Sequence, residues 1–360
     1  MGSMRESATL ALNAKAKALA SEGKTIYNLT AGELHSNTPE YIQDYVSGKL
    51  TLNKYTPVAG FPELRHLLAE STSKNYQLEW VKPSNVVVTA GAKPALAATF
   101  LALIDEGDEV IMPTPAWVSY KHLVELAGGK VIEVSTTENF DLDLTAIKAA
   151  ITKKTRAIII NSPNNPTGCV YSKSRLDELA KILKGTDIFV ISDDIYAKLV
   201  FTDNYTLPAK SGFDNLIIIN GFSKSQALTG WRIGYVVAPN KVAQAITQLL
   251  SHITGNASII SQEAAIAAMQ SDDTPPAQTL AHLKVQRQLV MDKLSSSKNL
   301  KLHEPEGAFY YFVDITKITH DSETWCEKLL DSTGVAVVPG EAFSAPGFFR
   351  LSFVTDAQVL

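Results

Sequence analysis

Short apolar runs alternate with segments of helical periodicity through most of the chain. Seven runs are rich enough in Val and Ile to be strands, and we expect them at 86–89, 109–112, 130–134, 157–161, 188–193, 216–221 and 233–238. The spacing of apolar positions predicts helices over 93–104, 119–128 and 174–185. This alternation is typical of an α/β fold, in which helices cover a mostly parallel sheet.

The pattern changes toward the C-terminus. A polar interruption at 271–276 precedes a long helical stretch at 277–294. Two strand-like runs follow at 307–315 and 348–353. We interpret this tail as a smaller α+β lobe that is separate from the main sheet.

Composition excludes several classes of function. The 360 residues are 45% hydrophobic and 19% charged, which is typical of a soluble globular enzyme. The net charge of -4 gives no basic field for nucleic acid. The longest apolar run, at 95–104, is about half of what a bilayer requires, and no signal peptide pattern is present. Cys169 and Cys326 lack the spacing of a disulfide framework or zinc site, so we expect a cytoplasmic, metal-free protein.

Polar residues that follow strands carry the most weight, because ligands of open α/β sheets bind beyond the carboxyl ends of the strands. At 89–96 a strand meets a glycine turn and then a helix with Pro94 in its first turn. Free N–H groups at such a helix start can bind an anion, although a plain strand-turn-helix corner explains the pattern equally well. The turn at 161–168 contains two prolines and would hold Asn165 in one orientation, and a purely structural turn is the alternative.

Two further strand ends carry charged residues. Asp193 ends an apolar strand, where a carboxylate is costly unless it faces a cation or a donor. We expect the next residue, Asp194, to be a solvated residue at a helix start. Lys224 follows the strand at 216–221, and Arg232 stands eight positions later. A buried lysine without a partner is unfavourable, so Lys224 is either solvated or functional.

Pyridoxal phosphate chemistry needs all of these groups together. Lys224 would form a Schiff base with the aldehyde of the cofactor. Arg232 would pair with the phosphate as a two-pronged donor, and Asp193 would keep the pyridine nitrogen protonated. The ring would then act as an electron sink for a carbanion at the substrate Cα.

The chain resembles the fold type I pyridoxal-phosphate aminotransferases of the aspartate aminotransferase family. The resemblance is specific to a bacterial subgroup with the motif SKxxAxTGWRIGY, which stands here at 223–235, and it extends from residue 7 to residue 353. It implies a large cofactor-binding domain at 40–280. The smaller α+β domain would combine 1–39 with 281–360.

The resemblance also implies roles for individual residues. Lys224 would carry the cofactor and move the proton between Cα and C4′. Asp193 would pair with the ring nitrogen. The other implied cofactor contacts are Tyr196 and Asn165 at the phenolic oxygen, Trp117 on the ring, and the backbone of Ala92 and Lys93 with Arg232 at the phosphate. Tyr55 would reach the phosphate of the neighbouring subunit, so the resemblance implies a homodimer with shared active sites.

Substrate recognition is implied in the same way. Arg350 would bind the α-carboxylate as a bidentate partner, helped by the N–H of Gly32, while Asn165 and Trp117 border the substrate. Lys93, Ser7 and Thr9 match the subgroup's site for a second carboxylate, and the point charge of a lysine suits such a group. Aspartate and glutamate are therefore the expected amino donors, with 2-oxoglutarate and oxaloacetate as acceptors.

Alternatives stay open at this stage. Prephenate or an aromatic amino acid could use the same site, because the shared residues recognise only carboxylates. A non-catalytic sensing module is a remote third possibility, since no basic N-terminal stretch is present. Taken singly, Trp117 would be a core residue, Tyr55 a loop residue, and Arg350 a surface arginine. Their joint occurrence in the family's order favours the functional interpretation.

Some positions depart from the subgroup. Leu34 and His35 stand where relatives have a different segment beside the substrate, and the chain ends before the usual last helix. Gly221 replaces a phosphate-binding serine, and we expect Ser223 to compensate. By the same resemblance, we predict cis peptide bonds at Thr114–Pro115 and Asn165–Pro166.

Overall fold

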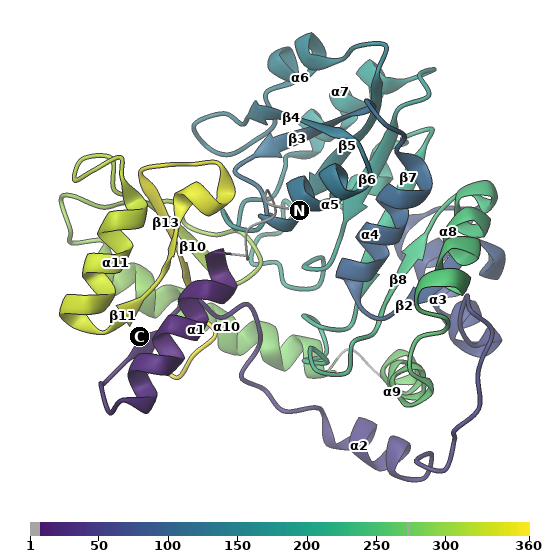
Figure 1. Cartoon of the computed structure of the whole chain (residues 1–360), viewed down its shortest axis with the longest axis horizontal. Helices are drawn as coiled ribbons and strands as arrows, with labels where there is room; N and C mark the ends of the chain where they lie inside the picture. The colour runs from purple at the N-terminus through teal and green to yellow at the C-terminus, as the bar shows by residue number, and fades with distance from the viewer. Residues whose placement is uncertain (1–7, 272–273) are drawn as a thin grey trace.

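The computed structural model describes residues 8–271 and 274–360, with the backbone alone at 8–11 and 274–275. The large lobe is built on a seven-stranded sheet, and the small lobe packs beside it (Figure 1). Among the described residues, no helix has the length and apolar character needed to cross a membrane.

The seven predicted strands are the seven strands of the large sheet. Their bounds are Val86–Thr89 (β2), Glu109–Thr114 (β3), Lys130–Ser135 (β4), Thr155–Asn161 (β5), Phe189–Asp193 (β6), Leu216–Gly221 (β7) and Gly234–Val237 (β8). Their order across the sheet is β2-β8-β7-β6-β5-β3-β4. Only β8 runs against its neighbours, which are β2 and β7. The mostly parallel α/β sheet is confirmed.

Helices cover both faces of this sheet. The helices of the large lobe are α2 (Glu40–Ser47), α3 (Pro62–Tyr76), α4 (Ala92–Leu103), α5 (Ser119–Leu126), α6 (Leu144–Ala150), α7 (Lys173–Leu183), α8 (Asn240–Ile253) and α9 (Ile259–Gln270). Of these, α2 packs on α9 rather than on the sheet (Figure 1). Side chains alternate between the faces, so Val86 and Val88 pack into one core and Val87 into the other. Burial on both faces explains why the strands are continuous apolar runs.

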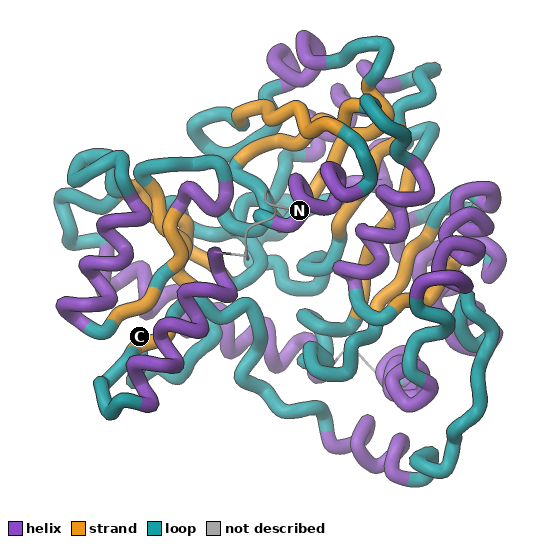
Figure 2. The backbone as a smooth tube through the Cα atoms, viewed as in Figure 1, coloured by secondary structure: helices purple, strands orange, loops and turns teal. Residues whose placement is uncertain are grey.

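The small lobe joins both ends of the chain. Its helices are α1 (Ala8–Ser21), α10 (Thr274–Leu294) and α11 (Ser322–Thr333). Its antiparallel sheet has the order β12 (Val338–Pro339), β13 (Phe348–Ser352), β10 (Tyr310–Asp314) and β9 (Lys301–Leu302). Strand β1 (Tyr27–Asn28) pairs in parallel with β11 (Val335–Ala336), which attaches the N-terminal segment to the C-terminal lobe. Figure 2 shows the strands of the two lobes as separate groups. The domain boundaries at 39/40 and 280/281 stay predictions.

In the described part of the chain, three peptide bonds before proline are cis, at Thr114–Pro115, Ser162–Pro163 and Asn165–Pro166. The first and third confirm the prediction. The cis bond at Ser162–Pro163 was not predicted.

Short 3₁₀ helices lie at Pro83–Asn85, Pro208–Ser211 and Gly340–Phe343.

Candidate active site

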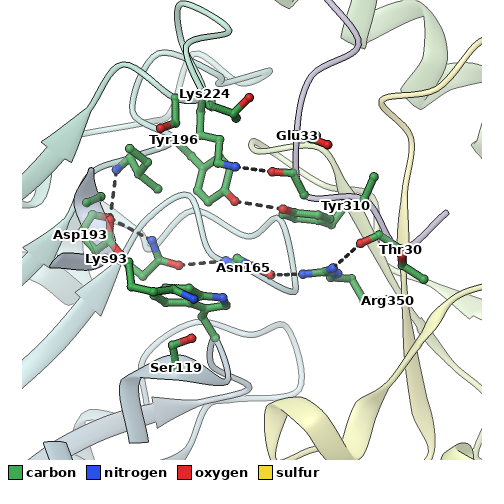
Figure 3. A pocket seen from close by; sticks show the side chains of 18 of the residues that line it. Thr30, Glu33, Lys93, Ser119, Asn165, Asp193, Tyr196, Lys224, Tyr310 and Arg350 are labelled. Atoms are coloured by element: carbon green, nitrogen blue, oxygen red, sulfur yellow. Dashed lines mark hydrogen bonds between the residues drawn. The ribbon is translucent and has the colours of Figure 1, made fainter. Parts of the chain in front are cut away.

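A cavity of about 520 Å³ opens beyond the carboxyl ends of the strands, between the two lobes. The sequence-predicted residues that line it are Gly32, Ala92, Lys93, Trp117, Asn165, Asp193, Tyr196, Ser223, Lys224, Arg232 and Arg350. Figure 3 shows side chains from both lobes converging on the same space. The cavity thus unites residues that are up to about 320 positions apart in sequence.

Of the predicted site residues whose side chains the structure describes, Tyr55 is not brought into the cavity. Tyr55 is 98% exposed and lies outside the cavity lining. Ser7 lies outside the described residues, and Thr9 belongs to the part of α1 where only the backbone is described. A role for Tyr55 therefore requires a second subunit.

The turn between β2 and α4 forms an anion-binding cradle. Gly91 has a φ of +103°, and the backbone N–H groups of the first turn of α4 follow it. A Cβ on Gly91 would lie 2.7 Å from Nη2 of Arg232, so the guanidinium lies directly over this turn. Nη1 of Arg232 donates to the carbonyl of Thr229 at 2.9 Å. A helix start with a cation fixed above it suits a phosphate.

Asp193 lies at the end of β6 and is almost fully buried. Tyr120 Oη donates to its Oδ2 at 2.7 Å, and the backbone N–H of Ile195 donates to its Oδ1 at 3.3 Å. Burial raises the pKa of Asp193 to about 6, although both hydrogen bonds and Lys224 oppose the shift. A cation placed beside this carboxylate would relieve the cost of its burial.

Asp194 corrects an expectation, because it is fully buried rather than solvated. No helix begins after β6, and the N–H of Asp194 still donates to Ile219 in the pattern of a strand. Consecutive strand residues point to opposite faces, so Asp194 turns away from the side that Asp193 faces. Ser192 Oγ donates to its Oδ1 at 2.6 Å, and burial raises the pKa of Asp194 to about 7.

Lys224 follows β7 and is half-buried, with its Nζ donating to the carbonyl of Gly32. Burial and, to a smaller extent, Arg350 lower the pKa of Lys224 to about 8, while Glu33 opposes the shift. A lysine with this pKa has a substantial neutral fraction near pH 8, which is the form that attacks a carbonyl carbon.

Arg350 is a buried cation, 2% exposed, on β13 of the small lobe. Its Nη1 donates to Asn165 Oδ1 and its Nη2 to the Thr30 carbonyl, both at 3.0 Å. Its Nε is buried without a partner, and no acidic side chain of the described residues pairs with it. Its guanidinium carbon lies 4.3 Å from the ring centre of Tyr310. A buried cation held only by neutral groups is a site for an anion.

Two tyrosines complete this part of the site. Tyr196 Oη lies 3.0 Å from Tyr310 Oη, and both side chains are buried (Figure 3). Sequence reasoning missed Tyr310 because it stands within the apolar run of β10, where it cannot be told from a core residue. It also missed Tyr120, whose only signal is its place three residues after Trp117.

The departure at Gly221 has a steric reason. A Cβ there would come 3.0 Å from the carbonyl oxygen of Ile233 and 3.1 Å from the Cα of Gly234. A serine at this position would therefore crowd β8. Ser223 is buried and lines the cavity two residues later.

Fold and site together define a class of protein, namely a two-lobed α/β enzyme with an activated lysine beside an anion cradle. Comparison with known proteins agrees, because the family model for aminotransferase class I and II matches residues 24–360. The chain belongs to this family, whose members transfer amino groups with pyridoxal phosphate.

Individual relatives are similar over nearly their whole length. The chain is 42% identical to the aspartate aminotransferase of Thermotoga maritima, covering 98% of this chain and 93% of the relative. It is 39% identical to the aspartate/prephenate aminotransferase of Thermus thermophilus, covering 99% and 94%. The solved structure of Thermus thermophilus aspartate aminotransferase with maleate has a TM-score of 0.95 at 39% identity, covering 99% of this chain and 94% of that one.

Proposed function

We propose that this aminotransferase moves the amino group between aspartate or glutamate and 2-oxoglutarate or oxaloacetate. The observation that carries the proposal is a pair of cations in one cavity, Arg350 from the small lobe and Lys93 from the large lobe. They lie on either side of Asn165 in Figure 3. Two cations suit a substrate with two carboxylates.

The residues present fit pyridoxal phosphate. When bound, the cofactor supplies an electron-withdrawing ring that stabilises negative charge at the substrate Cα. Arg232 and the backbone of Ala92 and Lys93 would hold its phosphate at the cradle beside Gly91, with Ser223 nearby. The carboxylate of Asp193 would keep the ring nitrogen protonated. Tyr196 and Asn165 would bind its phenolic oxygen, and Trp117 would lie against the ring.

Lys224 has two functions in this proposal. Its amine would bond to the cofactor, and its Nζ would later move the proton that leaves Cα. A pKa of about 8 supports both functions, because the amine can then accept and release a proton near neutral pH. The carbonyl of Gly32 holds the amine in place.

Arg350 would bind the α-carboxylate of the substrate. Its present acceptors are neutral oxygens of Asn165 and Thr30, which bind a guanidinium less strongly than a carboxylate does. The N–H of Gly32 would add a donor, and Lys93 with Ser7 and Thr9 would receive the distal carboxylate. This arrangement would set both the orientation of the substrate and the bond that is broken.

Prephenate is a second candidate acceptor. It also carries two carboxylates, and a relative at 39% identity is named an aspartate/prephenate aminotransferase.

We also propose a homodimer, supported by the exposure of Tyr55. The cytoplasmic location stays a prediction.

Steady-state transamination separates these substrates. The purified holoenzyme is assayed with aspartate as donor and with 2-oxoglutarate, oxaloacetate, prephenate or phenylpyruvate as acceptor. We expect 2-oxoglutarate to give the highest kcat/KM.

A second experiment tests the role of Lys224. Borohydride reduction followed by peptide mapping should label Lys224. Label on another lysine, or no turnover of aspartate, would contradict the proposal.

A further inference from the structure

The charges around the cavity leave one cation without a function. Among the described residues, the Lys, Arg, Asp and Glu side chains that line it are Lys17, Lys93, Lys224, Arg232, Arg350, Glu33 and Asp193. The proposed function uses one cation for the cofactor aldehyde, one for its phosphate and one for each substrate carboxylate. Lys17, on α1 of the small lobe, remains.

Hydrogen bonds connect α1, the helix that carries Lys17, to Arg350, the proposed ligand of the substrate α-carboxylate. Asn13 stands four residues earlier, on the same face of α1, and both residues line the cavity. Asn13 Oδ1 accepts from Asn28 Nδ2 at 2.6 Å, and Asn28 Oδ1 accepts from Thr30 Oγ1 at 2.7 Å. The Thr30 carbonyl in turn accepts from Arg350. This chain of hydrogen bonds fixes the position of α1 relative to Arg350.

The two lysines in the middle of α1 differ in their partners. Lys15 pairs with Asp331 at 3.6 Å on the outer side of the helix. Lys17 has no ion pair among the described residues, and its side chain is exposed at the cavity. The compact charge on its flexible four-carbon stem is therefore available to an anion that enters the cavity.

We infer that Lys17 binds the distal carboxylate of substrates longer than aspartate, namely glutamate, 2-oxoglutarate and longer α,ω-dicarboxylic acids. The inference rests on the proposed function. With one carboxylate held at Arg350, each added methylene moves the other carboxylate further out from this anchor. Lys93, 5.0 Å from the ring centre of Trp117, binds the distal carboxylate from the large lobe, and Lys17 adds a second cation on α1 for the longer substrates.

Unreactive dicarboxylates test this assignment without turnover. The holoenzyme is titrated with succinate, glutarate and adipate, and binding is followed by the absorbance of the bound cofactor. In Lys17→Ala, we expect affinity for glutarate and adipate to fall about three- to fivefold, as for a partly exposed charge pair. Affinity for succinate should change less than twofold. Lys17→Arg should retain the wild-type order, and Lys15→Ala, the matched control on the same helix, should match the wild type.

The outcomes separate the inference from the function on which it rests. Unchanged affinities in Lys17→Ala, or an equal loss for all three acids, would overturn the role of Lys17 while leaving the aminotransferase proposal intact. If the wild type bound no dicarboxylate and did not transaminate aspartate, the proposed function would fail and the inference with it.

Discussion

Asp193, the proposed partner of the cofactor's ring nitrogen, lowers the stability of the folded protein. The folded chain raises its pKa from 3.8 to about 6, mainly through burial. Between these values the folded state holds a proton that the unfolded state releases, so stability is lost as pH rises through about 6. The shift spans about two pH units, each equivalent to about 1.4 kcal/mol.

Replacing Asp193 by Asn should therefore stabilise the apoprotein and inactivate the enzyme. At pH 8 we expect the free energy of unfolding of Asp193→Asn to exceed that of the wild type by about 1 to 3 kcal/mol. At pH 4 the difference should nearly vanish, because the wild-type carboxyl is then protonated. Urea unfolding of the cofactor-free proteins at both pH values measures this difference in the free energy of unfolding. Asp187→Asn, a change at an exposed aspartate, is the control. A less stable variant at pH 8 would show that the Tyr120 hydrogen bond outweighs burial.

Replacement of the single residue Lys93 tests how the enzyme selects its substrate. In Lys93→Ala, we expect kcat/KM for aspartate to fall about tenfold or more relative to kcat/KM for alanine, because only aspartate loses a charge-assisted contact. Lys93 also lies in the first turn of α4, so cofactor affinity is measured in parallel. Equal losses for both amino acids, with the cofactor still bound, would make Lys93 a scaffold residue.

At the scale of elements, the β2–α4 turn depends on one glycine. In Gly91→Ala the new Cβ would meet Arg232 and would also strain a residue with φ of +103°. Gly107 has a φ of +87° but open space around it, so Gly107→Ala isolates the backbone strain. We expect both variants to lose about 1 kcal/mol of stability and only Gly91→Ala to lose cofactor affinity, by tenfold or more. Spectrophotometric titration with pyridoxal phosphate measures the second effect, and equal affinities would refute the cradle.

Strands were the most predictable elements, for a physical reason. Runs such as Ile158–Ile160 are buried on both faces, so their composition alone marks them. The direction of β8 was not predictable, because an antiparallel and a parallel buried strand have the same composition. The pairing of β1 with β11 joins two-residue strands about 300 positions apart, and no local pattern marks such a contact.

The site was predictable where a strand end carries an unusual residue, as with Asp193, Lys224 and Asn165. It was not predictable where the partner is an ordinary core aromatic, as with Tyr120 and Tyr310. Asp194 was predicted to be solvated at a helix start, and this was wrong because no helix begins directly after β6. The reactive side chains at strand ends can be recognised from their immediate sequence neighbours. The side chains that hydrogen-bond to them or pack against them come from other helices and strands, so local sequence does not mark them.

At the scale of the whole molecule, the active site joins the two lobes. The Arg350–Asn165 hydrogen bond runs from β13 of the small lobe to the turn after β5 of the large lobe. A substrate carboxylate at Arg350 would compete with this bond, so substrate binding would be coupled to the relative position of the lobes.

In the proposed homodimer, the exposed segment around Tyr55 would connect one molecule to another. Tyr55 is 98% exposed and Leu50 is 69% exposed, which is unusual for apolar side chains of one short segment. In the proposed dimer, Tyr55 of one subunit completes the phosphate site of the other. We therefore expect Tyr55→Ala to fold normally and to bind the cofactor more weakly.

Mixing two defective variants tests whether Tyr55 acts across the proposed interface. Lys224→Ala lacks the lysine proposed to carry the cofactor, and Tyr55→Ala lacks the tyrosine proposed to reach the partner's phosphate site. If Tyr55 acts in the partner's site, a hybrid dimer has one site with both defects and one intact site. After the two variants exchange subunits, activity at limiting cofactor should rise well above the mean of the separate proteins. If Tyr55 served its own subunit, both sites of the hybrid would be defective, and no recovery would be seen at any mixing ratio.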